Sequence, residues 1–286
     1  MNAAGTAAVR MLRNHGSELK LIFLTPIVIY VTIPFAFKIC PTIVTKLVYL
    51  NFLRRPFIDF KQPANYLLNH TVNLYLIPEE GITVGVWHTV PDKRWQEARG
   101  KDQQWYEAAL GDDNPVIVYL HGNGGNAECT WVPRISPGLQ SVATNTARSL
   151  HEKVGSPADA VILESPFTSL REEVAYHPLA VYYKIFPAFE WFFMDTLTEN
   201  NIIFHNVENL KSISTPVLIL HAEDDNIIPF ELGKKLYESL LDSQIPERQV
   251  KFVAFPALLG YKHNNIYKDP QLPEILKEFV KNMRRY

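Results

Sequence analysis

The sequence has only two cysteines, Cys40 and Cys129, among its 286 residues. A disulfide framework or a cysteine-rich zinc module needs more, so both classes are excluded. The chain also lacks an excess of either charge, because 28 Lys and Arg stand against 30 Asp and Glu. With a net charge of −2 it has no general basic footprint, and we expect no nucleic-acid partner. No period of 20–50 residues repeats, which excludes solenoids and propellers.

The hydrophobic content of the chain is enough for a sizeable core. Hydrophobic residues make up 47% of the chain and charged residues 20%, so wholesale disorder is excluded. At roughly 150 residues per domain, this length allows one large domain or two small ones.

One long uncharged run, Leu21–Phe37, lies between Lys20 and Lys38. As a helix it would rise about 26 Å at ~1.5 Å per residue. A bilayer core is about 30 Å thick, so the run reaches the short end of spanning length. We expect a membrane-anchoring and interfacial segment over 21–55, preceded by a tail at 1–20.

Two other interpretations of this run stay open. A cleaved signal peptide would need a small-residue cleavage site, which the end of the run, Thr32–Phe37, supplies poorly. A buried core helix is disfavoured by Pro26 and Pro34. Basic residues lie on both sides of the run, so the positive-inside count does not choose an orientation. Asn69-His70-Thr71 is the only Asn-x-Ser/Thr sequon, and glycosylation at Asn69 fits a lumenal or extracellular body.

From residue 64 onward the pattern is that of a globular domain, 64–286. Two strands around a turn come first, at Thr71–Leu76 and Ile82–Val90. Four further strands then alternate with helices. We expect those strands at Pro115–Leu120, Ala158–Leu163, Pro216–Leu220 and Gln249–Phe255, and helices at Ser141–Val154, Glu231–Leu241 and Leu272–Met283. This alternation predicts an α/β fold with a mostly parallel sheet, whose chemistry gathers at the carboxyl ends of the strands.

Polar clusters follow three of these strands. The glycine-rich loop His121–Gly125 suits an oxyanion hole, a phosphate loop or a plain turn. The acidic stretch His221–Pro229 suits a carboxylate that orients a histidine, a cation site or a capped turn. His263 follows the last strand, where it is either a catalytic base or one of the chain's structural histidines.

These clusters, in this order, resemble the α/β-hydrolases. Longer strings resemble the membrane-bound lysophosphatidylserine and monoacylglycerol lipases of the alpha/beta-hydrolase domain-containing class, and most of all their B-type form. The strings are Tyr119–Gly125, Asp159–Glu173, Leu218–Pro229, Gly260–His263 and the early Val86–Pro91.

The resemblance implies a serine esterase that cleaves lysophospholipid or monoacylglycerol esters, with no metal and no organic cofactor. It implies that Asp225 is the triad acid, with Asp224 as second choice, and that His263 is the base. The backbone N–H of Asn123 would be an oxyanion-hole donor. In such a triad serine attacks the ester, histidine takes its proton and aspartate orients the imidazole. The resemblance also implies a single-pass protein of the endoplasmic reticulum membrane with a lumenal hydrolase domain.

The chain departs from the family at the nucleophile. It contains no Gly-x-Ser-x-Gly elbow, and the one threonine version, Gly81–Gly85, lies in the early strand pair. Only sixteen residues, 126–141, stand where two strands and two helices belong, although at ~30 residues per βαβ unit these need some 60. A splice variant or a gene-model error would produce such a sequence. Ser136 and Ser141 are weak substitutes.

We therefore expect a truncated hydrolase fold that is inactive as written. Either the remaining strands pair directly, with Val116–Leu120 beside Val161–Leu163, or the sheet keeps exposed edges. The alternative function is a non-catalytic, membrane-tethered form that binds lipid or protein. The aromatic run Tyr182–Met194 suits a lid or membrane-contacting surface as well as an ordinary helix core.

Overall fold

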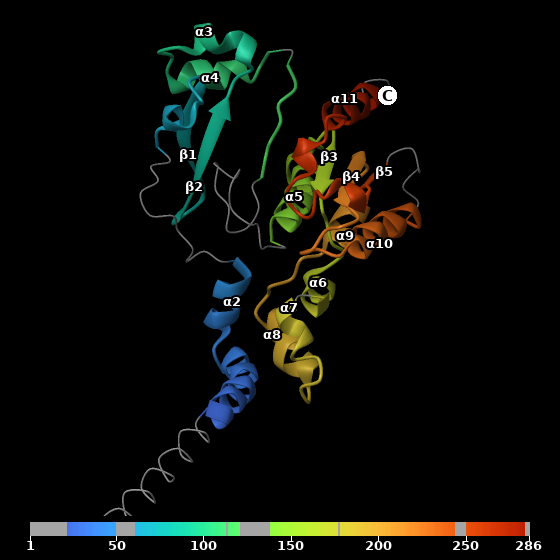
Figure 1. Cartoon of the computed structure of the whole chain (residues 1–286). Helices are drawn as coiled ribbons and strands as arrows, with labels where there is room; N and C mark the ends of the chain where they lie inside the picture. Colours follow the sequence, from blue (N-terminus) through green and yellow to red (C-terminus); the bar gives the residue numbers. More distant parts are fainter. Residues whose placement is uncertain are drawn as a thin grey trace, which may run out of the picture. The chain divides into compact units, whose positions relative to one another are not determined.

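The computed structural model describes residues 22–49, 61–112, 114–120, 138–176, 178–243 and 250–283 (Figure 1). The chain forms two compact units. The helical unit comprises the described parts of Met1–Val48 and Ser169–Phe204, and the sheet unit those of Tyr49–Thr168 and His205–Tyr286. The boundaries that we predicted at 20, 55 and 64 stay predictions.

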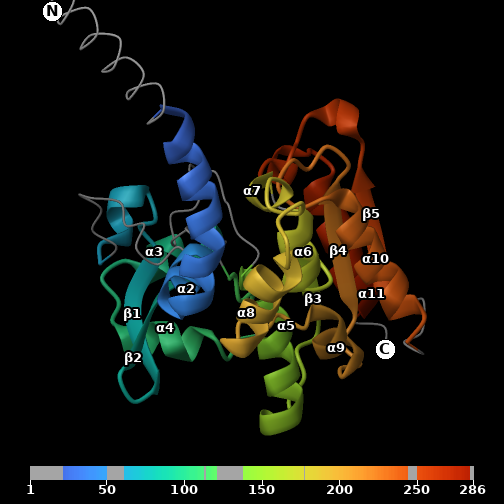
Figure 2. The same ribbon diagram turned by 90° about the horizontal axis from the view of Figure 1, so that it is seen from below.

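The sheet unit contains a parallel three-stranded sheet in the order β3-β4-β5 (Figures 1 and 2). The strands are β3 (Val161–Glu164), β4 (Val217–Ala222) and β5 (Val250–Phe255). Four helices accompany them: α5 (Gly138–Ser149), α9 (Asn206–Lys211), α10 (Phe230–Leu241) and α11 (Leu272–Met283). The predicted α/β class with a parallel sheet is confirmed, and α11 has the predicted bounds.

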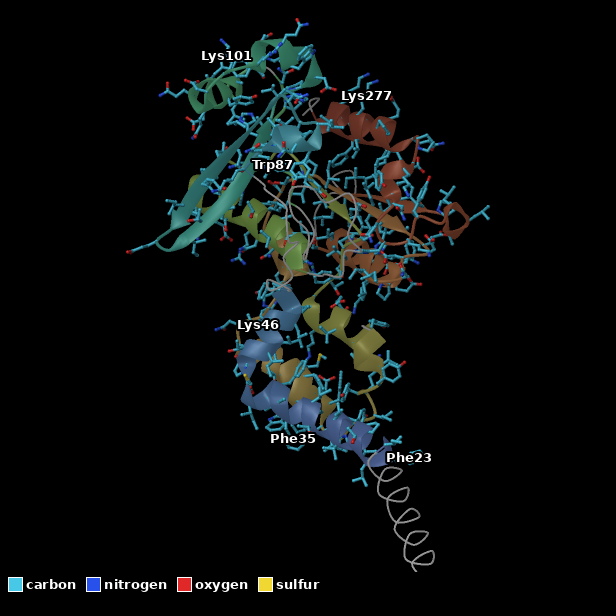
Figure 3. All side chains as sticks on the ribbon, turned by 60° about the vertical axis from the view of Figure 1, so that its left-hand side comes forward. Phe23, Phe35, Lys46, Trp87, Lys101 and Lys277 are labelled. Atoms are coloured by element: carbon cyan, nitrogen blue, oxygen red, sulfur yellow. The ribbon has the colours of Figure 1, made fainter. Side chains whose placement is uncertain are left out.

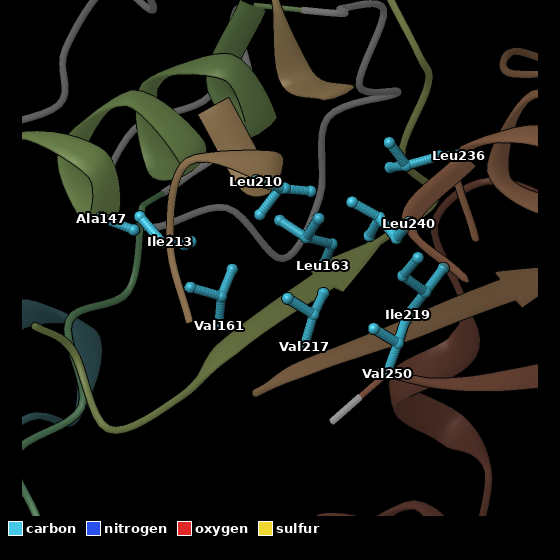
Figure 4. Packing of buried hydrophobic residues seen from close by; sticks show 10 residues of the cluster. All are labelled: Ala147, Val161, Leu163, Leu210, Ile213, Val217, Ile219, Leu236, Leu240 and Val250. Carbon is cyan, nitrogen blue, oxygen red and sulfur yellow. The ribbon is translucent and has the colours of Figure 1, made fainter. Parts of the chain in front are cut away.

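Strand β4 is apolar throughout because both of its faces are covered. Successive side chains of a strand point to opposite faces. Val217 and Ile219 pack with residues of α5, α9 and α10 (Figure 4). Leu218 and Leu220 pack in a second core that includes Phe279 of α11. This two-sided burial explains the continuous apolar run, which is typical of parallel sheets.

The strand predicted at Pro115–Leu120 is wrong. Residues 115–120 have no regular secondary structure, and Ile117 is 85% exposed. Within the described part of the chain β3 pairs only with β4, so the expected direct pairing of 116–120 with β3 is not formed. An apolar, β-prone run becomes a strand only when neighbouring strands supply hydrogen bonds along its length and its faces are covered, and among the described residues no strand pairs with this run.

The early strand pair is confirmed. Strands β1 (Thr71–Glu79) and β2 (Ile82–Thr89) form an antiparallel hairpin. Gly81 has a φ of 80°, the left-handed region that glycine adopts without strain, and it turns the chain between them. The helix-favouring stretch that follows forms α3 (Trp95–Ala98) and α4 (Gln103–Ala109), and Tyr106 of α4 is buried in a small cluster with Val90.

The helical unit begins with the helix Ile22–Ile39, which has a mean hydropathy of 2.0 and is almost entirely exposed. It is long and apolar enough to cross a membrane, and Figure 3 marks Phe23 and Phe35 on it. The unit also contains α2 (Pro41–Tyr49, to its penultimate residue), α6 (Leu170–Tyr176), α7 (Pro178–Val181), a π-helical turn at Glu190–Met194 and α8 (Asp195–Glu199).

Candidate functional site

The site is built on the loop that leaves β4. Its central residue is Asp225, whose N–H donates to the carbonyl of Ala222 at the end of the strand (3.1 Å). The carboxylate Oδ1 accepts from the N–H groups of Ile227 and Ile228, both at 2.9 Å. This turn closes on its own aspartate, as Asx turns do, and leaves Oδ2 directed at other partners.

His263 provides the main partner. It follows β5 and a 3₁₀ turn at Ala257–Leu259, after which Gly260 and Lys262 take left-handed φ values of 67° and 51°. The imidazole is buried, and its Nδ1 lies 2.8 Å from Oδ2 of Asp225. Since the carboxylate can only accept, Nδ1–H donates, and Nε2 holds the lone pair that a general base needs.

The two loops are held together by the acidic residues that precede Asp225. Glu223 accepts from the N–H of Ala257 (3.1 Å), and Asp224 accepts from the N–H of Lys262 (3.0 Å). The geometry therefore assigns Asp224, our second choice for the triad acid, to holding the histidine loop. Each of the three carboxylates accepts a backbone N–H, and the described residues contain no group of three or more His, Cys, Asp or Glu side chains placed to hold a metal ion.

The environment keeps Asp225 ionised. Burial by itself would raise the pKa of the fully buried carboxyl. The hydrogen bonds from His221, from His263 and from the N–H of Ile227 outweigh burial and hold the pKa of Asp225 well below its usual range. An ionised carboxylate is what stabilises the imidazolium formed when a histidine takes a proton.

A second histidine, His221, contacts the same carboxylate, and the sequence analysis predicted no role for it. Its Nε2 lies 3.3 Å from Oδ2 of Asp225 and 3.1 Å from the carbonyl of Ile228. Both neighbours are acceptors, so Nε2 carries the proton. The ring is fully buried and lies directly against Gly233 of α10, where a Cβ would approach Nδ1 to 2.1 Å. The signal in the sequence is a histidine four residues before the acid, with a glycine eight residues beyond that acid.

Two other predicted site residues, Asn123 and Ser136, lie outside the described residues. Ser141 lies in α5, and its side chain is not among the described ones. The threonine of the Gly81–Gly85 match lies in β2, as its place in the early strand pair implied.

Ser165 has the backbone form closest to that of an elbow serine. It follows β3 with a φ of 51°, and its N–H donates to the carbonyl of Leu220 at 2.7 Å. An elbow serine stands exposed at the top of a sheet and begins a helix. Ser165 is 1% exposed and is followed by a proline, so it does not offer a nucleophile to solvent.

Known proteins share this sequence over almost its whole length. The lysophosphatidylserine lipase ABHD12 of chicken (Gallus gallus) is 42% identical, and the match covers 97% of this chain and 88% of that protein. The zebrafish (Danio rerio) lipase of the same name is 43% identical over 88% of this chain and 81% of its own. This chain belongs to the ABHD12 family. Human ABHD12B, the B-type form that we expected, is 36% identical over 83% of this chain and 80% of its own.

No family model matches the chain. The ABHD12 comparison also measures what is missing. The match with the chicken protein runs over 341 positions, 55 more than the 286 residues of this chain. ABHD12 therefore has at least that many positions without a counterpart here, a size close to the segment that we expected to be absent. Its location near 126–141 stays a prediction.

Proposed function

We propose that this chain is a membrane-anchored member of the ABHD12 family that keeps the acid–base half of a serine-esterase triad and lacks its nucleophile. The observation that carries the proposal is the hydrogen bond of 2.8 Å between buried His263 and Asp225, in a sequence with no Gly-x-Ser-x-Gly. The substrate class would be lysophospholipid or monoacylglycerol esters, as the names of the relatives and the resemblance suggest.

Without a nucleophile this pair has nothing to activate. In a serine protease whose triad residues were mutated one at a time, removal of the triad serine lowers kcat about 10⁶-fold. We therefore expect no measurable ester hydrolysis by this chain. Its remaining function would be non-catalytic, either binding a lipid ester or tethering a partner at the membrane.

The test is labelling of the purified full-length chain with a fluorophosphonate, which reacts with activated serines, and mapping of any label by mass spectrometry. The chain is compared with His263→Ala and with His205→Ala, a matched change at an exposed surface histidine. We expect no label in any of the three, and a cooperative thermal transition in the unmodified chain.

A single labelled serine that is lost in His263→Ala but kept in His205→Ala would show a working triad and overturn the proposal. The absence of both label and cooperative melting would overturn it differently, because the domain would then not be folded.

The anchor and its orientation belong to the same proposal. The helix Ile22–Ile39 supplies the span, and the exposed sequon residue Asn69 follows it in the chain. We propose a single pass of the endoplasmic reticulum membrane with the sheet unit in the lumen. On expression in cells the chain should then carry one glycan that a glycosidase removes, and Asn69→Gln should abolish it. The matched change Asn65→Gln, at an exposed asparagine outside the sequon, should leave it in place. An unglycosylated wild-type chain would contradict the lumenal orientation.

A further inference from the structure

The helix Ile22–Ile39 is covered along one stripe only. Its residues at 30, 33, 34, 36, 37 and 38 are partly or fully buried, and all of them except Ala36 fall on one helix face. Every described position before Tyr30 is exposed, and Phe35, at the edge of this stripe, is still 47% exposed. Something therefore packs on the carboxyl-terminal half of this helix and leaves the rest bare.

The covering element is the aromatic run that we predicted as a lid, a membrane surface or a core. Tyr183 stacks on Tyr30 with ring centroids 4.7 Å apart, and the Tyr30 hydroxyl donates to the carbonyl of Tyr182 at 2.9 Å. Further along, Phe192 packs on Phe35. Phe193 packs on Phe37 at 5.3 Å. The run follows the helix over at least eight residues.

The run also presents apolar side chains outward. Ile185 is 87% exposed, Tyr182 71% and Val181 52%. The helix beside the run also exposes apolar side chains, and Val28 is 55% exposed. Exposed apolar side chains that gather on neighbouring elements mark a membrane or a partner.

The polar limit of this surface lies at the end of the helix. Lys38 forms an ion pair with Glu199 of α8 at 2.6 Å, and its ammonium lies 4.6 Å from the ring centre of Trp191. Lysine and tryptophan side chains together are typical of the membrane–water interface. From Lys38 back to Tyr30 a helix descends roughly 12 Å, which is within the hydrocarbon core of a bilayer.

The backbone of the run is compatible with such a depth. The N–H groups of Tyr183 and Lys184 donate to the carbonyl of Ala180, and that of Phe186 donates to Tyr183. Polar backbone groups in hydrocarbon must be satisfied internally, and these turns do so. The charged end of Lys184 turns back over the ring of Tyr176 in α6, as a snorkelling lysine does.

We propose that residues 181–194 enter the lipid bilayer beside the helix Ile22–Ile39, with Ile185, Tyr182 and Val181 in contact with the acyl chains of phospholipids. The chain then holds the membrane by two segments far apart in the sequence. This inference rests on the proposed membrane anchor, and it adds a second membrane-contacting element to it.

The test places a fluorophore at single sites in the full-length chain, reconstituted in phosphatidylcholine vesicles. Cys40 and Cys129 are replaced by serine, and Ile185→Cys or Tyr182→Cys is labelled with the polarity-sensitive dye NBD. Val28→Cys reports on the helix itself. Leu258→Cys is the matched control, because Leu258 is an exposed hydrophobic residue of the sheet unit.

We expect the labels at 185 and 182 to emit as in an apolar medium and to be quenched by a nitroxide on the lipid acyl chain, as the label at 28 is. The label at 258 should instead be quenched by aqueous iodide. If 28 is quenched by the lipid nitroxide but 185 and 182 behave like 258, the inference is overturned while the anchor stands. If the labels at 28, 182 and 185 all fail to respond to the lipid nitroxide, the proposed anchor is wrong and so is the inference.

Discussion

Replacing Gly233 by alanine should destabilise the sheet unit, although the same change inside a helix normally stabilises by about 1 kcal/mol. Gly233 is the fourth residue of α10, and a Cβ there would come within 2.1 Å of Nδ1 and 2.9 Å of Cε1 of His221. One of the two residues must move, because real Cβ atoms do not approach other atoms so closely.

The His221 ring has no room to give way. It is fully buried, its Nε2 is bonded to the carbonyl of Ile228, and it packs edge-on against Phe230 at 5.5 Å. Overpacking a core costs about 1–3 kcal/mol, and a hydrogen bond lost in the adjustment costs about 1 kcal/mol more. After subtraction of the helix-propensity gain, the free energy of unfolding should fall by about 1–3 kcal/mol.

For a domain of this size that loss lowers the midpoint of thermal unfolding by roughly 2–10 °C, measured by circular dichroism in detergent. Ser239→Ala, an exposed position on the same helix, is the control and should change stability by less than about 0.5 kcal/mol. A double-mutant cycle is decisive, since in the His221→Ala background the alanine at 233 meets no ring and should cost little. If Gly233→Ala stabilises the chain, or if its cost is the same in both backgrounds, the reasoning is refuted.

Three further predictions follow from charge and exposure. The pKa of Asp225 is lowered in the folded state, so its contribution to stability is present above the unfolded pKa and is lost as the pH falls below about 4. Asp225→Asn should therefore flatten the acid limb of a stability–pH curve. Burial raises the pKa of Glu173 to about 8, so stability should decline as the pH rises from about 4.5 to 8, and Glu173→Gln should remove that decline. Ile117→Lys should slow aggregation without shifting the midpoint of thermal unfolding, because the exposed run 116–119 is β-prone and uncharged. The control Leu258→Lys, at an exposed leucine outside this run, should slow aggregation less.

The run at 115–120 also shows where prediction from sequence stops. It and the run at 216–220 have nearly the same composition, and both were expected to be buried strands. Only the second is one, because β3 and β5 hydrogen-bond to its two edges and α10 and α11 cover its faces. The prediction of α11 depended less on neighbouring elements, because the spacing of its own apolar residues defines one helix face, and its bounds were predicted correctly.

The same distinction applies to the site. The resemblance implied the roles of Asp225 and His263, and these roles stay predictions. Their places after two strands of a parallel sheet are consistent with the contact of 2.8 Å between them. His221 and Gly233 were missed because their contact joins β4 to α10 and depends on how closely these two elements pack. No local pattern in a single sequence reports that distance.

The position of the acid–base pair in the fold explains how it persists without the nucleophile. Among the described residues, the hydrogen bonds that hold Asp225 and His263 come from the end of β4, which contains His221 and Ala222, and from the two loops after β4 and β5. The loss of the nucleophile that we propose would leave these contacts in place. We therefore expect catalysis and folding to be separable in this chain. A fluorophosphonate label reports only on the first and a cooperative melt only on the second, so neither result can stand in for the other.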